Sequence, residues 1–398
     1  MTTVTNEIFN EVLSETEQAV RDTMHRFALE VLRPIGKELD NLTPEEAIAK
    51  DSIFWEAHKK YDELGMDEFT ADDSLTAVEL ARISALSSEM MGWGDAGLAI
   101  SLTLGAMPQN FSQLTGNADL IARCAPDRIG CWAVTEPGHG SDIVDMYGDE
   151  RPERKFRGDC VATKDGDNFV ISGQKSSWVS NGSFAENAGL FCTYADNNGV
   201  QGGGAFVVPL DLPGVSRGKP TDKVGQRSLN QGEIFFDDVV IPADYMIAGP
   251  DQYDDFLHTV LTGANGGMGS LFAGLARAAL EHAVEYAKER IQGGKPIIQH
   301  QAVKIRLFEM FRKVEAARAL NLRVVTHNAV NPRFELAVAS KVTSTNTALE
   351  VATEAMSIYG GAGMTKENPI EKLMRDASVS VIEDGENTFL GMLAADRL

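Results

Sequence analysis

Residues 133–142 read AVTEPGHGSD, and the character of the chain changes at this stretch. Before it, from residue 6 to about residue 122, apolar side chains recur three and four positions apart, as in Met24, Phe27 and Val31. This spacing predicts helices that each bury one face, and therefore an all-helical first domain. The breaks expected within that domain lie at Pro34, Pro44 and residues 92–97.

After Arg128 the pattern favours strands, because short runs of β-branched and aromatic residues alternate with turns that contain Gly, Asn, Asp or Pro. The clearest runs are residues 168–172, 189–194, 205–210 and 233–240. Helical spacing returns from about residue 251, in three long segments that predict a bundle. We therefore expect a helical domain (residues 1–128), an antiparallel β-domain (residues 129–246) and a second helical domain (residues 247–398).

The bulk composition narrows the classes of function. The 398 residues include 58 acidic and 36 basic side chains, for a formal net charge of −22. A field of this sign repels phosphate groups and anionic membrane surfaces, so we expect no nucleic-acid partner and no membrane insertion. Residues 1–20 are polar and acidic and do not read as a leader. Because neither the cysteines nor the histidines show metal-ligand spacing, we expect reduced thiols, no bound metal and a cytoplasmic location.

Three blocks of sequence resemble the signatures of acyl-CoA dehydrogenases. Residues 133–142 resemble the first signature, with His139 where a small residue is more usual. Residues 173–182, GQKSSWVSNG, are similar to the family's G-x-K-x-x-W-I-[ST]-N-G, and residues 358–377 follow its late signature from IYGGAG to EKLMRDA. The blocks keep the family's order and span most of the chain. The resemblance implies an α+β fold whose last domain is a four-helix bundle, and an oxidoreductase that acts on CH–CH groups.

The resemblance also implies that FAD binds between the β-domain and the last domain. No Rossmann glycine motif follows a predicted strand, so the flavin must be held in another way. By analogy with the family, Trp178 covers one face of the flavin ring, while Val134, Thr135 and Ser180 form hydrogen bonds with its polar edge. Ser141 marks the substrate side. The remaining cofactor positions that the resemblance implies around the flavin are Trp132, Gly140, Ser141 and Glu386.

A second set of implied cofactor contacts indicates an oligomer. Arg290 and Gln292 match family positions that reach the pyrophosphate and adenosine of FAD from a neighbouring subunit, and a guanidinium suits a diphosphate. The resemblance therefore implies a homo-oligomer, as a homotetramer, with helical contacts from residues 277–331. Gly293 replaces an aromatic residue that is common at this position. The other cofactor positions implied here are Gln301, Ser357, Gly360 and Gly361.

The family reaction needs a carboxylate that removes the proton α to the thioester carbonyl while a hydride leaves the β carbon. Most members place a glutamate in the sequence IYEGT, and an ungapped match puts Asp384 on that glutamate and Glu383 on the tyrosine. A second family position for the glutamate falls near Ala264, whose residue type excludes it. Asp384 is thus the expected base. The substrate-binding residues implied are Ser141, Glu383, Asp384 and Gly385.

Asp95 is the alternative base. It lies in the segment GWGDAG, residues 92–97, which matches a region that helps to enclose the acyl tail in the family. A carboxylate there would suit proton removal at a more distant carbon of a cyclic enoyl-CoA. The competing interpretation is that Asp95 caps a helix.

The acidic residues around Asp384 also bear on the substrate. Asp384 is one methylene shorter than glutamate, and charged neighbours are costly beside a long apolar chain. We therefore expect a short, branched or cyclic acyl-CoA, and the resemblance implies an electron-transfer flavoprotein as the oxidant. Other chemistries on this scaffold are oxidation of a carrier-protein-bound acyl group, a non-redox elimination and a non-catalytic partner subunit. Residues 143–172 form a segment longer than the family's usual connection.

Overall fold

The computed structural model describes residues 13–66, 74–144 and 158–398. Helices alone form the described part of the chain up to residue 123. They are α2 (Glu15–Phe27), η1 (Ala28–Leu32), α3 (Arg33–Leu39), α4 (Pro44–Ala47), α5 (Phe54–Asp62), α7 (Ala77–Gly94), α8 (Ala96–Gly105), α9 (Met107–Thr115) and α10 (Ala118–Arg123). The breaks expected at Pro44 and within residues 92–97 are confirmed. The break expected at Pro34 is wrong, because the chain passes through the π-helical turn η1 and continues directly as α3.

A mixed sheet of eight strands follows the first helices. The strands are β1 (Gly130–Ala133), β2 (Val161–Asp165), β3 (Asn168–Lys175), β4 (Asn187–Asp196), β5 (Gly199–Pro209), β6 (Val215–Arg217), β7 (Ile234–Pro242) and β8 (Met246–Ala248). Their order is β6-β7-β3-β2-β4-β5-β8, with β1 also paired to β4. The expected antiparallel pairing holds for most neighbours. Strand β4 instead pairs in parallel with β1 and β2, because long connections let both of its neighbours enter the sheet in its own direction.

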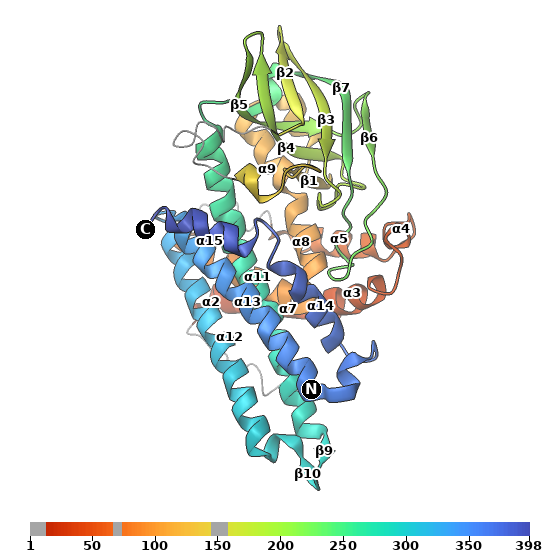
Figure 1. Cartoon of the computed structure of the whole chain (residues 1–398), viewed down its shortest axis with the longest axis vertical. Helices are drawn as coiled ribbons and strands as arrows, with labels where there is room; N and C mark the ends of the chain where they lie inside the picture. The colour runs from red at the N-terminus through yellow and green to blue at the C-terminus, as the bar shows by residue number, and fades with distance from the viewer. Residues whose placement is uncertain (1–12, 67–73, 145–157) are drawn as a thin grey trace.

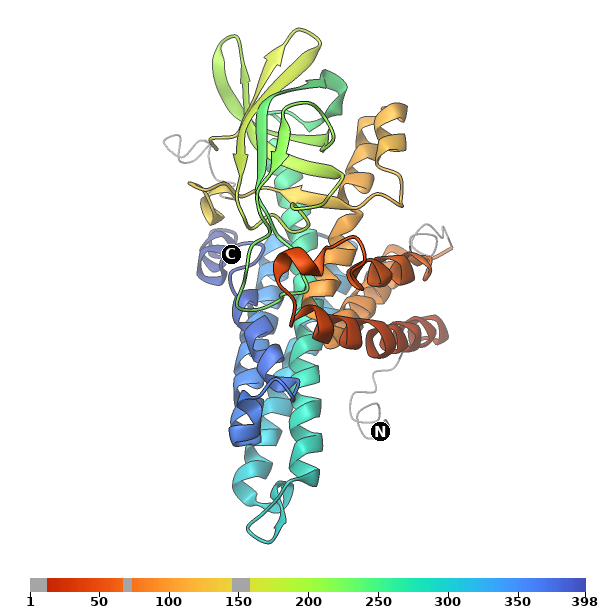
Figure 2. The same ribbon diagram turned by 90° about the vertical axis from the view of Figure 1, so that its right-hand side faces the viewer.

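The chain ends in long helices, as the spacing predicted. They are α11 (Tyr253–Glu289), α12 (Gln301–Asn328), α13 (Phe334–Tyr359), α14 (Ile370–Ser380) and α15 (Asn387–Ala395), with the hairpin β9 (Ile291–Gln292) and β10 (Lys295–Pro296) and the short turns η5 (Ile297–Gln299) and η6 (Gly360–Met364) between them. The sheet and this hairpin lie at opposite ends of the long axis (Figure 1). Figure 2 shows the first helices on one side, between those two ends.

The fold is therefore α+β. The switch from helix to sheet falls between α10 and β1, and the switch back falls between β8 and α11. We propose the domain boundaries at these two switches. No helix in the described residues combines the length and the apolar character that a membrane crossing needs.

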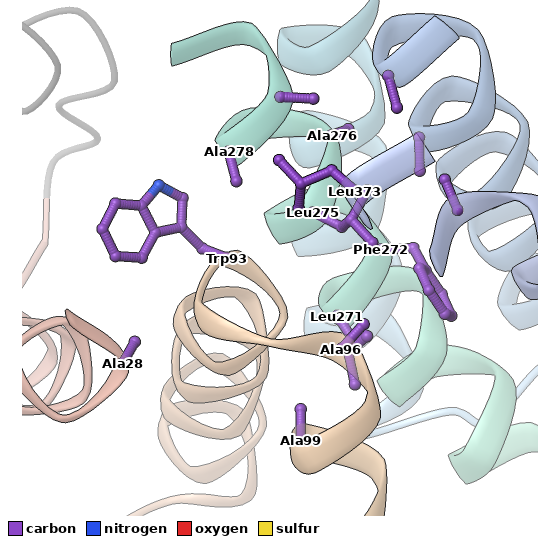
Figure 3. Close-up of a cluster of buried hydrophobic side chains, with 14 of the residues drawn as sticks. Ala28, Trp93, Ala96, Ala99, Leu271, Phe272, Leu275, Ala276, Ala278 and Leu373 are labelled. Carbon is purple, nitrogen blue, oxygen red and sulfur yellow. The ribbon is translucent and has the colours of Figure 1, made fainter. Parts of the chain in front are cut away.

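The main core lies where α7, α8 and α11 meet. Figure 3 shows Ala96 of α8 beside Leu271 of α11, whereas Trp93 at the end of α7 extends to the other side, towards Ala278. Phe272 and Leu275 are fully buried, and the cluster extends into the N-terminal helices and α14. This core packs the first helices against the last domain. It therefore holds α7, α8 and α11, which line the functional cavity, in fixed positions.

Two glycines let α7 and α11 cross with their backbones in contact. A Cβ atom at Gly274 would overlap the carbonyl oxygen of Glu89, and one at Gly92 would overlap that of Leu271. Neither backbone can move away without disturbing the core around Trp93 and Phe272. The crossing therefore requires glycine on both helices.

We predict that Gly274→Ala destabilises the protein by about 1–3 kcal/mol, because the new methyl group would overpack the crossing. Gly263→Ala is the matched control. Gly263 is an exposed residue of the same helix with open space around its Cβ position, so alanine there should stabilise by about 0.5–1 kcal/mol. Urea denaturation midpoints of the two variants would test this. Equal stability of the two variants would contradict the backbone crossing.

Candidate active site

A cavity of about 670 Å³ lies where the sheet meets the helices. Its walls come from α7 and α8, from β1 and the segment after it, from the β6–β7 connection, from α11 and from the loop after α14. The predicted site residues that line this cavity are Trp132, Val134, Thr135, Gly140, Ser141, Trp178, Ser180, Glu383, Asp384, Gly385 and Glu386. The fold thus brings together residues from all three sequence blocks or the segments next to them.

A buried ion pair builds the sheet side of the cavity. Lys175 at the end of β3 is fully buried, and its Nζ donates to Glu136 Oε1 (2.6 Å), Val134 O (2.9 Å) and Phe191 O (2.7 Å). The other carboxylate oxygen of Glu136 accepts from the backbone N–H of Cys160 at 3.1 Å. A buried ammonium needs such partners, because an unpaired charge away from water is costly. Lys175 therefore fixes the segment on which Val134 and Thr135 face the cavity.

The same wall offers the surface that a flavin ring needs. The indole of Trp178 is 60% exposed, which is unusual for so large an apolar side chain, and it lines the cavity. Trp132 also lines the cavity, and its buried Nε1 has no hydrogen-bond partner in the described residues. Ser180 Oγ accepts from Gln231 Nε2 at 3.1 Å. A flat aromatic face beside free and bound polar groups fits a planar, hydrogen-bonding cofactor.

The loop between α14 and α15 brings the acidic residues to the cavity. Asp384 and Gly385 have φ angles of 49° and 103°, so the chain turns sharply through two left-handed residues. Glu386 then caps α15, with its carboxylate accepting from the N–H groups of Thr388 and Phe389 at 2.9 and 3.0 Å. Its own N–H donates to Ser141 Oγ at 3.1 Å, which ties the loop to the first sequence block.

Lys341 stabilises the loop between α14 and α15. It is fully buried in α13, and its Nζ donates to Gly385 O (2.9 Å) and to Asn387 Oδ1 (2.8 Å). Burial lowers the pKa of Lys341 to about 8, although the carboxylates of Asp384, Glu383 and Glu386 act in the opposite direction. The lysine therefore supplies both an anchor and a positive charge next to the strained turn.

The two cavity carboxylates have different surroundings. No hydrogen bond to the Asp384 carboxylate is found in the described residues, and burial raises its pKa above the ordinary value, with Lys341 opposing the rise. Glu383 accepts from Gln226 Nε2 at 3.1 Å. Burial raises the pKa of Glu383 to about 8, partly offset by Gln226 and reinforced by Asp384. Asp384 is thus the carboxylate left free to take a proton.

Asp95 does not reach the cavity. It caps α8 through the N–H of Leu98 (2.9 Å), accepts from Ser228 Oγ (2.5 Å) and pairs with Lys372 Nζ (2.6 Å). It is 4% exposed and is absent from the cavity lining. The interpretation of Asp95 as a helix cap is confirmed. As a distal base it would need a free oxygen facing the cavity, and the structure gives it none, so we do not propose it in that role.

The other predicted cofactor contacts lie away from the cavity. They occupy the far end of the molecule near the β9–β10 hairpin, and all are exposed in the single chain (Figure 1). These residues are Arg290, Gln292, Gln301, Ser357, Gly360 and Gly361. Ser357 Oγ accepts from Arg306 Nη2 at 2.8 Å. A contact with a neighbouring subunit's cofactor stays a prediction for this set.

Family models match both later parts of the chain. Residues 131–239 match the acyl-CoA dehydrogenase middle domain, and residues 258–398 match the acyl-CoA dehydrogenase C-terminal domain. The chain belongs to the acyl-CoA dehydrogenase family. Members of this family are flavin-dependent oxidoreductases, and the cavity described above has the wall that such a cofactor requires.

Individual acyl-CoA dehydrogenases resemble the chain over most of its length. It is 29% identical to the mitochondrial short-chain specific acyl-CoA dehydrogenase of Bos taurus, covering 97% of this chain and 90% of that protein. An acyl-CoA dehydrogenase of Bacillus subtilis is 34% identical over 78% of this chain and 77% of its own. Butyryl-CoA dehydrogenase from Megasphaera elsdenii superposes with a TM-score of 0.81, at 26% identity, covering 98% of this chain and 99% of that chain.

A glutaryl-CoA dehydrogenase from Mycobacterium smegmatis in complex with FADH2 shares the fold at 21% identity. Its TM-score is 0.80, covering 99% of this chain and 96% of that chain.

Ala264, at the second position where acyl-CoA dehydrogenases can hold the base, lines the cavity with a methyl group. The loop with Asp384 is therefore the part of this wall that presents a free carboxylate.

Sequence reasoning missed several residues around the cavity. The sequence predicts no role for Lys223, Gln226, Gln231 and Lys341, and it marks Lys175 only as a member of the second block. Lys341 had a usable signal, because it is the single charged residue in the otherwise apolar and small-residue run AVASKVTSTNTAL of residues 337–349. The lysine and glutamines of the β6–β7 connection had no such signal, because only the folded turn places Lys223 and Gln231 in the cavity lining and Gln226 beside Glu383.

We predict that Lys175→Met weakens flavin retention and destabilises the fold by about 3–5 kcal/mol, because Glu136 would remain buried without its partner. Lys164→Met, on the neighbouring strand β2, is the control, because that lysine is partly exposed and packs over Phe169. The ratio of visible flavin absorbance to protein absorbance, and the thermal midpoint, would report both effects. Full flavin content at unchanged stability would contradict the role given to Lys175.

We predict that Lys341→Met moves the acidic limb of the kcat/KM profile to higher pH by about one unit. The ammonium favours ionised Asp384, so its removal raises the pKa of that carboxyl, and the activity loss should be larger at low pH than at high pH. Glu383 and Glu386 on the same loop and Lys223 opposite remain in both proteins. Asn387→Ala removes one acceptor of Lys341 but keeps its charge, so its limb should stay in place. An unmoved limb in Lys341→Met would refute the electrostatic role.

Proposed function

We propose that this acyl-CoA dehydrogenase uses FAD to oxidise a short, branched or cyclic acyl-CoA, with Asp384 as the base. The observation that carries the proposal is the position of Asp384, the cavity carboxylate without a hydrogen-bond partner in the described residues. A base must accept a proton, so a free and partly desolvated carboxylate is the competent form. Bound flavin supplies the hydride acceptor of the reaction.

The turn at Asp384 also presents a donor. The backbone N–H of Asp384 has no acceptor in the described residues. Such a group can donate to the thioester oxygen, whose negative charge grows as the α proton leaves. One residue would then hold the carbonyl and remove the proton next to it. This pairing favours removal at the α carbon over removal at a distant one.

The walls support a small acyl group. The cavity must hold the flavin ring as well as the acyl chain, and its far wall is filled by large side chains such as Met91, Ile100 and Leu271. The charged surroundings of Asp384 disfavour a long alkyl chain. The named relatives include a short-chain specific enzyme and a butyryl-CoA enzyme.

The surface supports an oligomer. Ile291 near the hairpin is 65% exposed, and Ile305 and Phe308 on α12 are 61% and 55% exposed. Apolar side chains of this size favour burial against another chain. We propose a homotetramer in which Arg290 and Gln292 reach a neighbour's FAD, and an electron-transfer flavoprotein as the oxidant of the reduced enzyme.

We predict that Asp384→Asn slows anaerobic bleaching of the flavin by butyryl-CoA by about 10²–10⁴-fold, because the amide cannot accept the proton. Flavin content should remain normal. Asp95→Asn is the comparison variant, and it should lower stability through loss of its pairing with Lys372 while bleaching per bound flavin persists. Bleaching lost only in Asp95→Asn would overturn the assignment of the base.

A further inference from the structure

One corner of the cavity is polar in a way that removal of an α proton does not require. We call Lys223, Gln226 and Glu383 the polar corner; Lys223 and Glu383 line the cavity, and the buried Gln226 contacts Glu383 without lining it. Gln226 is fully buried with φ 50°, and its Nε2 donates to Glu383 Oε2 at 3.1 Å. Its backbone N–H donates to Asp376 Oδ1 at 2.5 Å, which anchors the turn on α14. These contacts hold Glu383 in a fixed orientation beside the base.

Lys223 forms the other side of the corner. Its Nζ donates to Leu229 O (2.6 Å) and to Gln231 Oε1 (2.9 Å), and Leu229 N donates back to Gln226 O (2.9 Å). Burial lowers the pKa of Lys223 to about 8, although Glu383 acts in the opposite direction. The corner is therefore a compact set of fixed polar groups in the cavity wall.

The polar corner adjoins the apolar part of the cavity. A Cβ atom at Gly97 would lie 3.3 Å from the carbonyl oxygen of Gln226, so the turn packs against the start of α8. Two and three residues further along, Ala99 and Ile100 of α8 line the cavity, as does Leu229 of the turn. Glu383 and these apolar side chains line the same cavity as Asp384, so an acyl group bound at Asp384 lies near both.

The corner has hydrogen-bonding capacity that the described residues do not use. Glu383 lines the cavity, and its Oε1 has no hydrogen-bond partner in the described residues. Gln226 Oε1 has none there either, but Gln226 is fully buried and does not line the cavity. A purely alkyl acyl group would cover Glu383 and exclude water from it, which costs about 1–3 kcal/mol for each polar group left unpaired. A substrate that supplies a hydrogen-bond donor avoids this cost.

We propose that Glu383 determines specificity by forming a hydrogen bond with a hydroxyl or amino substituent on the acyl group. This inference rests on the proposed function, because it assumes that the acyl chain lies beside Asp384. Consecutive Cα atoms are about 3.8 Å apart, so the substituent lies within a few bonds of the carbon that loses its proton. The substrate class is then a small acyl-CoA with a donor near the reacting carbons.

The test compares butyryl-CoA with 4-hydroxybutyryl-CoA, which differ by one hydroxyl group. We expect the wild-type protein to bleach with a kcat/KM at least about tenfold higher for the hydroxylated thioester. Glu383→Leu should abolish or reverse this preference, by slowing the hydroxylated substrate and favouring the plain one. Glu383→Gln keeps a carbonyl acceptor and should retain the preference. A wild-type ratio near one, or a ratio that Glu383→Leu leaves unchanged, would overturn the proposal.

A binding measurement separates this inference from the assignment of the base. Titration of the flavin absorbance of Asp384→Asn with the two thioesters gives their Kd values without turnover. We expect tighter binding of 4-hydroxybutyryl-CoA, and loss of that difference in the double variant Asp384→Asn with Glu383→Leu. Equal Kd values would refute the role of Glu383 even if Asp384 is the base. A Kd difference that depends on Glu383 would support it even if Asp384→Asn still bleached.

Discussion

The buried ion pair between Lys175 and Glu136 is the interaction on which the cavity depends. A fully buried ammonium is stable only where acceptors surround it, and here they come from the segment after the strand β1 and from β4. The lysine stands in the second sequence block and the glutamate in the first, so the pair joins the two blocks through the sheet. Val134 and Thr135 line the cavity because the buried ion pair fixes the position of their backbone.

Buried charges on the helices that pack around the cavity are paired as well. Glu89 accepts from Arg277 and Arg318, and Lys372 lies between Asp95 and Asp376, so these ions stabilise the contacts among α7, α11, α12 and α14. Asp384 differs, because its carboxylate has a nearby positive charge in Lys341 but no hydrogen bond in the described part of the chain. This contrast between paired charges elsewhere and the carboxylate of Asp384 is the basis for proposing Asp384 as the base.

The sequence predicted the order of helices and strands, because their periods of apolar residues are local properties. It also predicted the eleven cavity-lining positions named above, since the three blocks that carry or flank them keep a recognisable order. Asp95 shows where such reasoning ends. Its partner Lys372 lies 277 residues later, and only the packing of α14 against the α7–α8 corner reveals that the carboxylate is occupied. The glycine crossing of α7 and α11 was likewise invisible, because a glycine in a helix looks alike whether its Cβ position is open or blocked.

The length of α11 has a consequence for how the chain can change. This single helix runs from the cavity, where Ala264 lies, to the hairpin that follows Arg290, and it crosses α7 at Gly274 on the way. One inserted residue would advance everything beyond it by about 1.5 Å and rotate it by about 100°. The crossing glycine or the hairpin would then face the wrong direction. Insertions and deletions are therefore disfavoured along this helix, and changes of length in this scaffold should be sought in its loops, such as the connection after Asp142 where the sequence predicts extra residues.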